Sequence, residues 1–203
     1  MDAHQDKYAT FVEHPRYGRR PHFTELDPKP DLLRVTFHWR SQESCRIPGT
    51  AIAADLARQT PATVPVTHYF DEERICRDCG KPFIFFAEEQ KHWYEEFGFS
   101  LDSDCVRCVP CRKRQQGIVR VRARYEELFH MPARTVAENL EFADCCLTLV
   151  EQGLFHKRQT ERVRMLLNRV RDDCHDDVKY KELATRLQAI ENQTGQHGDV
   201  PSV

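Results

Sequence analysis

The spacing of hydrophobic residues predicts short, mixed elements in the first half of the chain. Residues 34–40 are apolar at every second position, which is typical of a strand with one buried face. Residues 51–57 predict a short helix capped by Thr50. Residues 83–86 form a compact apolar run that predicts a strand, and a helix that ends at Gly98 is expected after it. The alternating apolar residues of the first strand are Val35, Phe37 and Trp39.

Helical periodicity dominates the second half of the chain. From Cys111 onward, apolar residues recur at intervals that place them on one face of a helix, which is expected to pack on a core. These residues are Ile118, Val121, Tyr125, Leu128 and Phe129. Residues 135–191 predict three short helices. A capping box of Thr135 and Glu138 opens the first of them, and Gly153 follows its end.

Composition and charge restrict the kinds of partner. The 203 residues include 30 Lys and Arg against 32 Asp and Glu, so the formal net charge is −2. A nucleic-acid site must therefore be a local patch rather than a property of the whole chain. The first residues lack the pattern of a secretory signal, and no apolar run approaches the ~20 residues that cross a bilayer. We therefore expect a cytoplasmic protein with no membrane partner.

Five of the nine cysteines fall between positions 76 and 111. Structural disulfides are not expected, because the cytoplasm keeps thiols reduced and the count is odd. Two Cys-x-x-Cys pairs, Cys76 with Cys79 and Cys108 with Cys111, are separated by 28 residues. This spacing lets four thiolates converge on one tetrahedral Zn²⁺ ion. Nearby basic residues are expected to offset the negative charge of such a site: Arg77, Lys81, Arg107 and Arg112.

Two features leave alternatives open at this cluster. Cys105 extends the second pair to Cys-x-x-Cys-x-x-Cys, so it could replace Cys108 as a ligand. We prefer Cys108, because Cys111 would otherwise lose its partner two residues away. The same run resembles part of an iron–sulfur motif, but such motifs continue to a fourth cysteine followed by proline, whereas Arg112 follows Cys111 here. One structural Zn²⁺ is the expected cofactor.

The stretch from the first pair to the second resembles the bacterial "probable zinc-ribbon" family of zinc-ribbon or treble-clef-like proteins. The resemblance covers about residues 70–116: Cys-x-x-Cys-Gly-Lys-x-Phe, a Phe-rich strand, Glu-Gln-Lys-His-Trp-Tyr-Glu-Glu-Phe-Gly-Phe and Cys-x-x-Cys-Arg. It implies a zinc-binding fold and metal ligation by the two pairs, but no activity. Cys105 goes beyond the basic family pattern.

These observations together predict an α+β protein with a small zinc-ribbon or treble-clef-like unit and a helical C-terminal region. Tyr17 and Phe23 are expected to dock the N-terminal arm. The expected parts are an irregular arm (1–32), a zinc-binding α+β domain (33–131) whose zinc unit is about 70–116, a helical region (132–191) and a flexible tail (192–203).

The sequence predicts no catalytic residue, so we do not expect an enzyme. Four thiolate ligands leave zinc no open position for water or substrate. His92 is the histidine expected nearest the cysteines, and we prefer an exposed helical residue to a ligand or general base there. Phosphate-binding loops and hydrolase signatures are absent from the sequence, and no small-molecule substrate is implied.

The residues after the second pair suggest a binding surface. Between Cys105 and Tyr125 the chain carries seven basic residues and no acid. Such a helix can follow phosphates, or its charges can merely balance the thiolates and face water. The alternative is a protein partner. The chain would then be a protein-interaction adaptor, and the zinc unit would make it rigid. The expected nucleic-acid contacts are Arg112, Lys113, Arg120 and Arg124.

Overall fold

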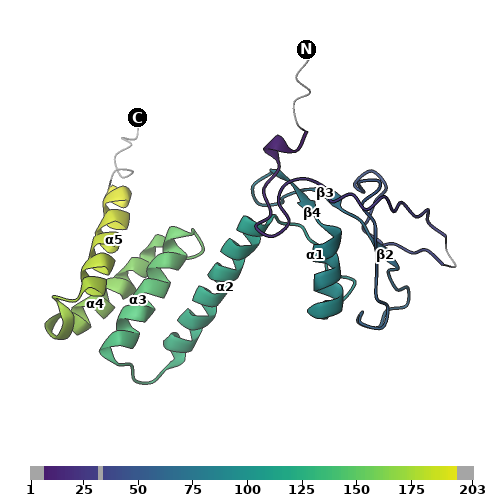
Figure 1. Ribbon diagram of the computed structural model, residues 1–203. Helices are drawn as coiled ribbons and strands as arrows, with labels where there is room; N and C mark the ends of the chain where they lie inside the picture. The colour runs from purple at the N-terminus through teal and green to yellow at the C-terminus, as the bar shows by residue number, and fades with distance from the viewer. Residues whose placement is uncertain (1–6, 32–33, 196–203) are drawn as a thin grey trace, which may run out of the picture. The chain divides into compact units, whose positions relative to one another are not determined.

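The computed structural model describes residues 7–31 and 34–195 (Figure 1). The chain divides into two compact units, one that extends to Lys113 and one that begins at Arg114. Helix α2, Val109–His130, begins in the first unit and ends in the second. None of the helices within the described residues is both long and apolar enough to cross a membrane.

A β-hairpin followed directly by a helix forms the centre of the first unit (Figure 1). Strand β3, Glu72–Ile75, pairs antiparallel with β4, Pro82–Phe85, as expected for the apolar run at residues 83–86. Helix α1, Ala87–Lys91, continues as a π-helical turn, His92–Glu96, and the chain then reverses at Gly98, where φ is +65°. The predicted order of strand, helix and glycine stop is confirmed.

Asp71 joins the N-terminal arm to this helix. Its carboxylate accepts hydrogen bonds from the backbone N–H of Ala87 (2.7 Å) and from that of His22 (2.8 Å). An acceptor at the start of a helix satisfies one of its otherwise unpaired N–H groups. Burial raises the pKa of this fully buried carboxyl to about 6, although the two backbone hydrogen bonds act in the opposite direction.

The N-terminal arm packs on the hairpin. Between residues 7 and 31 its helical element is a 3₁₀ turn, Lys7–Thr10, and Val12 bridges to Phe83 of β4. The Tyr17 ring lies 5.4 Å from the ring of Phe86, so Tyr17 docks the arm as predicted. Phe23 does not, because 70% of it is exposed.

The predicted strand at residues 34–40 is wrong. Val35 forms only an isolated bridge with Asp31, and beyond it the N–H of Thr36 donates to the hydroxyl of Thr67 (2.8 Å). The apolar pattern predicted that Trp39 is buried and His38 exposed, but Trp39 is 64% exposed and His38 is buried. His38 is held there by a hydrogen bond to a backbone carbonyl and by ring stacking, which apolar periodicity cannot reveal.

The predicted helix at residues 51–57 is also wrong. A two-residue strand, β1 (Ile52–Ala53), pairs there with β2 (His68–Tyr69). The Thr50 hydroxyl does not cap a helix, because it donates to the carbonyl of Ile47 (2.6 Å) and accepts from the N–H of Asp71 (3.0 Å). The Thr50 hydroxyl therefore hydrogen-bonds to the distant residue Asp71 and does not cap a helix.

The second unit consists of packed helices (Figure 1). The three predicted helices are α3, Val136–Glu151, α4, Thr160–Cys174, and α5, Val178–Gly195, with a short 3₁₀ turn at Lys157–Gln159. Both halves of the predicted capping box on α3 are present. Helix α5 continues past the predicted start of the flexible tail, and residues 196–203 lie outside the described residues.

Apolar faces of all these helices share one core. Tyr125 and Leu128 of α2 are buried in it, as the periodicity predicted, whereas Phe129 stays 44% exposed. Its other buried members are Leu140, Phe142, Ala143, Cys145, Cys146, Leu147, Leu149, Val150, Val163, Leu166, Leu167, Val170, Leu183, Leu187 and Ile190.

Candidate metal centre

The two cysteine pairs meet at one point of the first unit. The sulfurs of Cys76, Cys79, Cys108 and Cys111 all lie within 4.8 Å of one another. Four sulfurs bound at about 2.3 Å to one tetrahedral ion would lie about 3.8 Å apart. The Sγ atoms of Cys79 and Cys108 are 3.8 Å apart, so one sulfur from each pair already has the spacing that Zn²⁺ requires.

The first pair lies in the turn of the β3–β4 hairpin. The N–H of Cys76 donates to the carbonyl of Lys81 (2.9 Å), and the N–H of Gly80 donates back to the carbonyl of Cys76 (2.9 Å). Gly80 has a φ of +68°, as the sequence predicted for a tight turn after the second thiol. A side chain would have room at this position, so glycine is favoured there by the backbone conformation and not by a shortage of space.

The second pair lies at the start of α2. Cys108 precedes the helix, and Cys111 lies in its first turn, where backbone N–H groups have no partner within the helix. The positive end of the helix dipole favours a thiolate at this position. The expected placement of Cys111 at a helix start is therefore confirmed.

The ionisation of the thiols fits a site for a cation. Burial alone would raise the pKa of Cys76, but hydrogen bonds from backbone N–H groups, led by that of Cys108, lower it to about 6. Burial and the three neighbouring sulfurs raise the pKa of Cys111 to about 12. Four thiolates this close together repel one another unless a compensating charge lies between them. A divalent ion supplies that charge and deprotonates the remaining thiols.

Two of the basic residues expected to offset the thiolates are paired with carboxylates. Arg107 donates to Asp78 (2.9 Å), and Arg112 donates to Glu89 of α1 (2.5 Å). Arg112 also lies over the Trp93 ring, 4.8 Å from its centroid. Glu89 could not be predicted as a partner from the sequence, because its burial depends on the packing of α1 and gives no local signal.

Cys105 lies beside the four sulfurs without joining them. It is buried in the same core cluster, and its S–H donates to the carbonyl of Arg107 (3.5 Å). Burial raises its pKa to about 12, which favours the protonated thiol. The geometry therefore favours Cys108 over Cys105 as the third ligand.

We expect a Cys105→Ser protein to retain bound zinc, and a Cys108→Ser protein to lose it. The serine hydroxyl can donate to the Arg107 carbonyl in place of the thiol, whereas Cys108 supplies one of the four sulfurs. The measurement is the zinc content of each purified variant by elemental analysis. Loss of zinc from Cys105→Ser alone would reverse the assignment.

His92 lies outside the sulfur cluster. Its Nδ1 is 2.5 Å from Glu96 Oε2, four residues later in the same helical segment, and its ring packs on Phe97. Within the part of the chain that the structure describes, the four cysteines are the one group of ligand atoms close enough to hold a metal ion. This arrangement indicates a structural site.

The four basic residues expected to contact nucleic acid differ in their surroundings. Arg112 is largely buried by its contacts with Glu89 and Trp93, and Arg124 forms ion pairs with Glu127 (2.8 Å) and Glu141 (2.6 Å). Lys113 and Arg120 are exposed. Neither of these two makes an ion pair with any residue in the described ranges 7–31 and 34–195.

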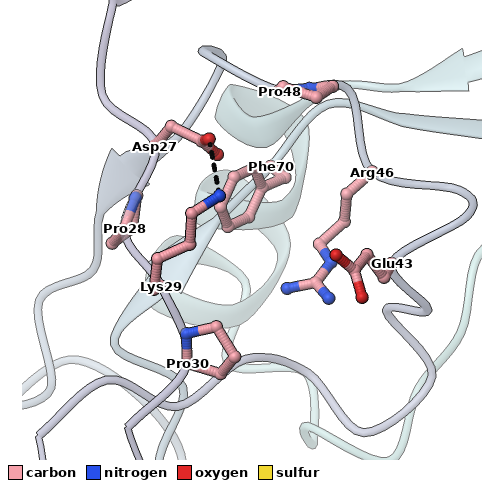
Figure 2. Close-up of a pocket in the computed structure, with 8 residues that line it drawn as sticks. All are labelled: Asp27, Pro28, Lys29, Pro30, Glu43, Arg46, Pro48 and Phe70. Atoms are coloured by element: carbon pink, nitrogen blue, oxygen red, sulfur yellow. Dashed lines mark hydrogen bonds and ion pairs between the residues drawn. The ribbon is translucent and has the colours of Figure 1, made fainter.

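A small pocket in the first unit carries opposed charges. Figure 2 shows Asp27 and Glu43 on its walls beside Lys29 and Arg46, with Phe70 on one side. Lys29 already pairs with Asp27 (3.2 Å), and the volume is about 70 Å³. Ligand pockets are usually about 300–1,000 Å³, so this one is too small for a metabolite and gives no preference for an ion of either sign.

Comparison with known proteins supports the fold of the cysteine unit. Residues 70–119 match the model of a family described as a probable treble clef domain. The match confirms the resemblance and the fold class predicted from the sequence, and the cysteine cluster within it fits a zinc site. No curated protein and no solved structure matches the chain.

Proposed function

We propose that this protein is a non-enzymatic binding module, held by one structural Zn²⁺, that contacts nucleic acid through α2. The observation that carries the proposal is a pair of exposed cations, Lys113 and Arg120, on the helix that begins at the cysteine cluster; neither has an ion-pair partner among the described residues. The zinc would be bound by Cys76, Cys79, Cys108 and Cys111, whose sulfurs are already gathered.

The cysteine cluster supports a structural role for the metal. Catalytic zinc keeps an open coordination position, usually beside histidine or carboxylate ligands. Here four sulfurs would complete the tetrahedron, and His92 is engaged with Glu96. The ion would then fix the hairpin turn to the first turn of α2.

The positions of the cations along α2 support a contact with phosphates. Lys113 and Arg120 are seven residues apart, so they lie within about 20° of each other around the helix axis. The helix carries no acidic residue before Glu126, and the neighbourhood of these two side chains therefore attracts anions. Arg112 and Arg124, which are paired with carboxylates, would support the helix rather than bind phosphate directly.

We expect Arg120→Glu to weaken nucleic-acid binding, and Arg122→Glu to weaken it less. Both side chains are exposed on α2, but Arg122 points about 160° away from Arg120 around the axis. Each lost phosphate contact lowers the slope of log K against log salt by about one unit. The measurement is fluorescence anisotropy with labelled single-stranded and duplex DNA and RNA over a range of salt concentrations.

An unchanged melting temperature in both variants is the necessary control. Equal effects of the two substitutions would show that binding does not depend on this side of α2. If wild-type protein shows no salt-sensitive binding to any of the nucleic acids, the proposal fails. A role as a protein-interaction adaptor would then explain the same exposed helix better, because apolar contacts weaken little with salt.

A further inference from the structure

A second surface of different chemistry lies on the helical unit. A groove of about 180 Å³ is bounded by Phe129 at the end of α2, by Arg134, by Phe142 of α3 and by α4. The α4 side chains are Arg162, Met165, Leu166 and Arg169. Residues 157–171 are rich in Lys and Arg, but the groove forms only where α2, α3 and α4 meet.

Three guanidinium groups border this groove, and none of the described residues that line it is acidic. Arg134 donates to the carbonyls of Leu128 (2.6 Å) and Met131 (3.2 Å), and Arg162 donates to the hydroxyl of Tyr125. These acceptors are neutral, so they fix the two side chains without cancelling their charge. Among the described residues, Arg134, Arg162 and Arg169 have no ion-pair partner.

The groove also exposes apolar surface. Met165 is 66% exposed and Phe129 is 44% exposed, and the Phe129 ring packs on the core residues Tyr125 and Phe142. Arg162 and Arg134 lie over the rings of Phe129 (4.9 Å) and Phe142 (4.8 Å). Arginine, methionine and aromatic residues placed together are typical of the centre of a protein interface.

We infer that this groove binds an acidic segment of a partner protein. An apolar side chain of that segment would lie against Phe129 and Met165, and its carboxylates would face Arg162 and Arg169. The volume supports a macromolecular ligand, because a groove of about 180 Å³ holds one or two side chains but is smaller than a usual metabolite pocket. The inference rests on the helical unit alone and does not depend on the proposed contact of α2 with nucleic acid.

The surroundings of Phe129 favour a peptide over a nucleic acid. Base stacking needs a free aromatic face. The Phe129 ring already stacks on Tyr125, with centroids 6.1 Å apart, and also lies under the Arg162 guanidinium. Arginines that are already held in place suit a peptide that carries carboxylates next to an apolar side chain. The planar guanidinium group can donate two hydrogen bonds to one carboxylate.

The test is a selection of random peptides on the full-length protein. We expect the selected peptides to be enriched in Asp and Glu next to Leu, Ile or Phe, relative to the starting library. Arg169→Glu should abolish the enrichment, and Arg171→Glu should preserve it. Both residues are exposed on α4, but Arg171 borders a different groove and donates to Asn168.

Methyl NMR of methionine then places the bound peptide. The chain has three methionines, and Met165 is in the groove, so a selected peptide should shift its resonance more than that of the half-buried Met131. No acidic enrichment, enrichment that survives Arg169→Glu, or an unperturbed Met165 would overturn the inference. A shift of Met165 caused by single-stranded RNA and not by the selected peptides would instead assign the groove to nucleic acid.

Discussion

Removal of zinc by a chelator is expected to unfold the cysteine-bearing unit and to leave the helical unit folded. The binding free energy of a structural Zn²⁺ is also folding free energy, about 10–16 kcal/mol in zinc-finger peptides. The helical unit has its own core, to which no member of the sulfur cluster contributes. The loss should therefore be confined to one unit.

The tryptophans allow the two units to be followed separately. Both Trp39 and Trp93 belong to the first unit, and Trp93 packs on Phe85 at 5.0 Å beside the cysteine cluster. Tryptophan fluorescence should therefore change on chelation, while most of the far-UV circular dichroism of α3, α4 and α5 remains. Fluorescence that does not respond to complete metal removal would show that the fold is independent of zinc.

The same reasoning applies to single cysteines. Cys79→Ser removes one of the four sulfurs and should lower the stability of the first unit by roughly 3 kcal/mol or more. Cys45→Ser is the matched control, because Cys45 lies outside the sulfur cluster and its sulfur contacts only the neighbouring hydroxyl of Ser44 at 3.9 Å among the described hydrogen bonds. Similar losses in the two variants would contradict the zinc assignment.

Leu147→Ala is expected to destabilise the helical unit by about 2–5 kcal/mol, because it leaves a cavity in a packed core. Leu147 is completely buried in α3, within the cluster that all the helices of this unit share. Urea unfolding followed by far-UV circular dichroism measures the change.

Met165→Ala provides the control for this core prediction. It also truncates a long apolar side chain within a helix, but Met165 is 66% exposed, so the stability should change by no more than about 0.5 kcal/mol. Comparable effects of the two substitutions would show that the helices do not share a specifically packed core.

Local sequence predicted the elements whose determinants are local. Thr135 and Glu138 satisfy each other's backbone N–H groups across one turn, so α3 could be located from four residues. Gly153 has a φ of +69° just after α3, as its position at the helix end indicated. The two cysteine pairs are local in the same sense, because each pair lies within a single turn or a helix start.

Long-range partners explain the elements that were missed. The Thr67 hydroxyl accepts from the N–H of Thr36, and the Asp71 N–H uses the hydroxyl of Thr50, so neither segment adopts its local preference. Similarly, the pairing of Arg124 with Glu141 could be known only after α3 had been placed beside α2.

The Asp71 carboxylate connects the arm to α1 by hydrogen bonds, and this connection bears on the boundaries of the folded domain. The segment that matches the treble clef family starts at residue 70, yet Phe11 and Tyr17 cover Ile84 and Phe86. His22 supplies one of the two backbone N–H groups that donate to the Asp71 carboxylate. A fragment cut at the family boundaries would expose these rings to water and leave a buried carboxylate short of a donor. The segment that matches the family model is therefore smaller than the packed unit to which it belongs.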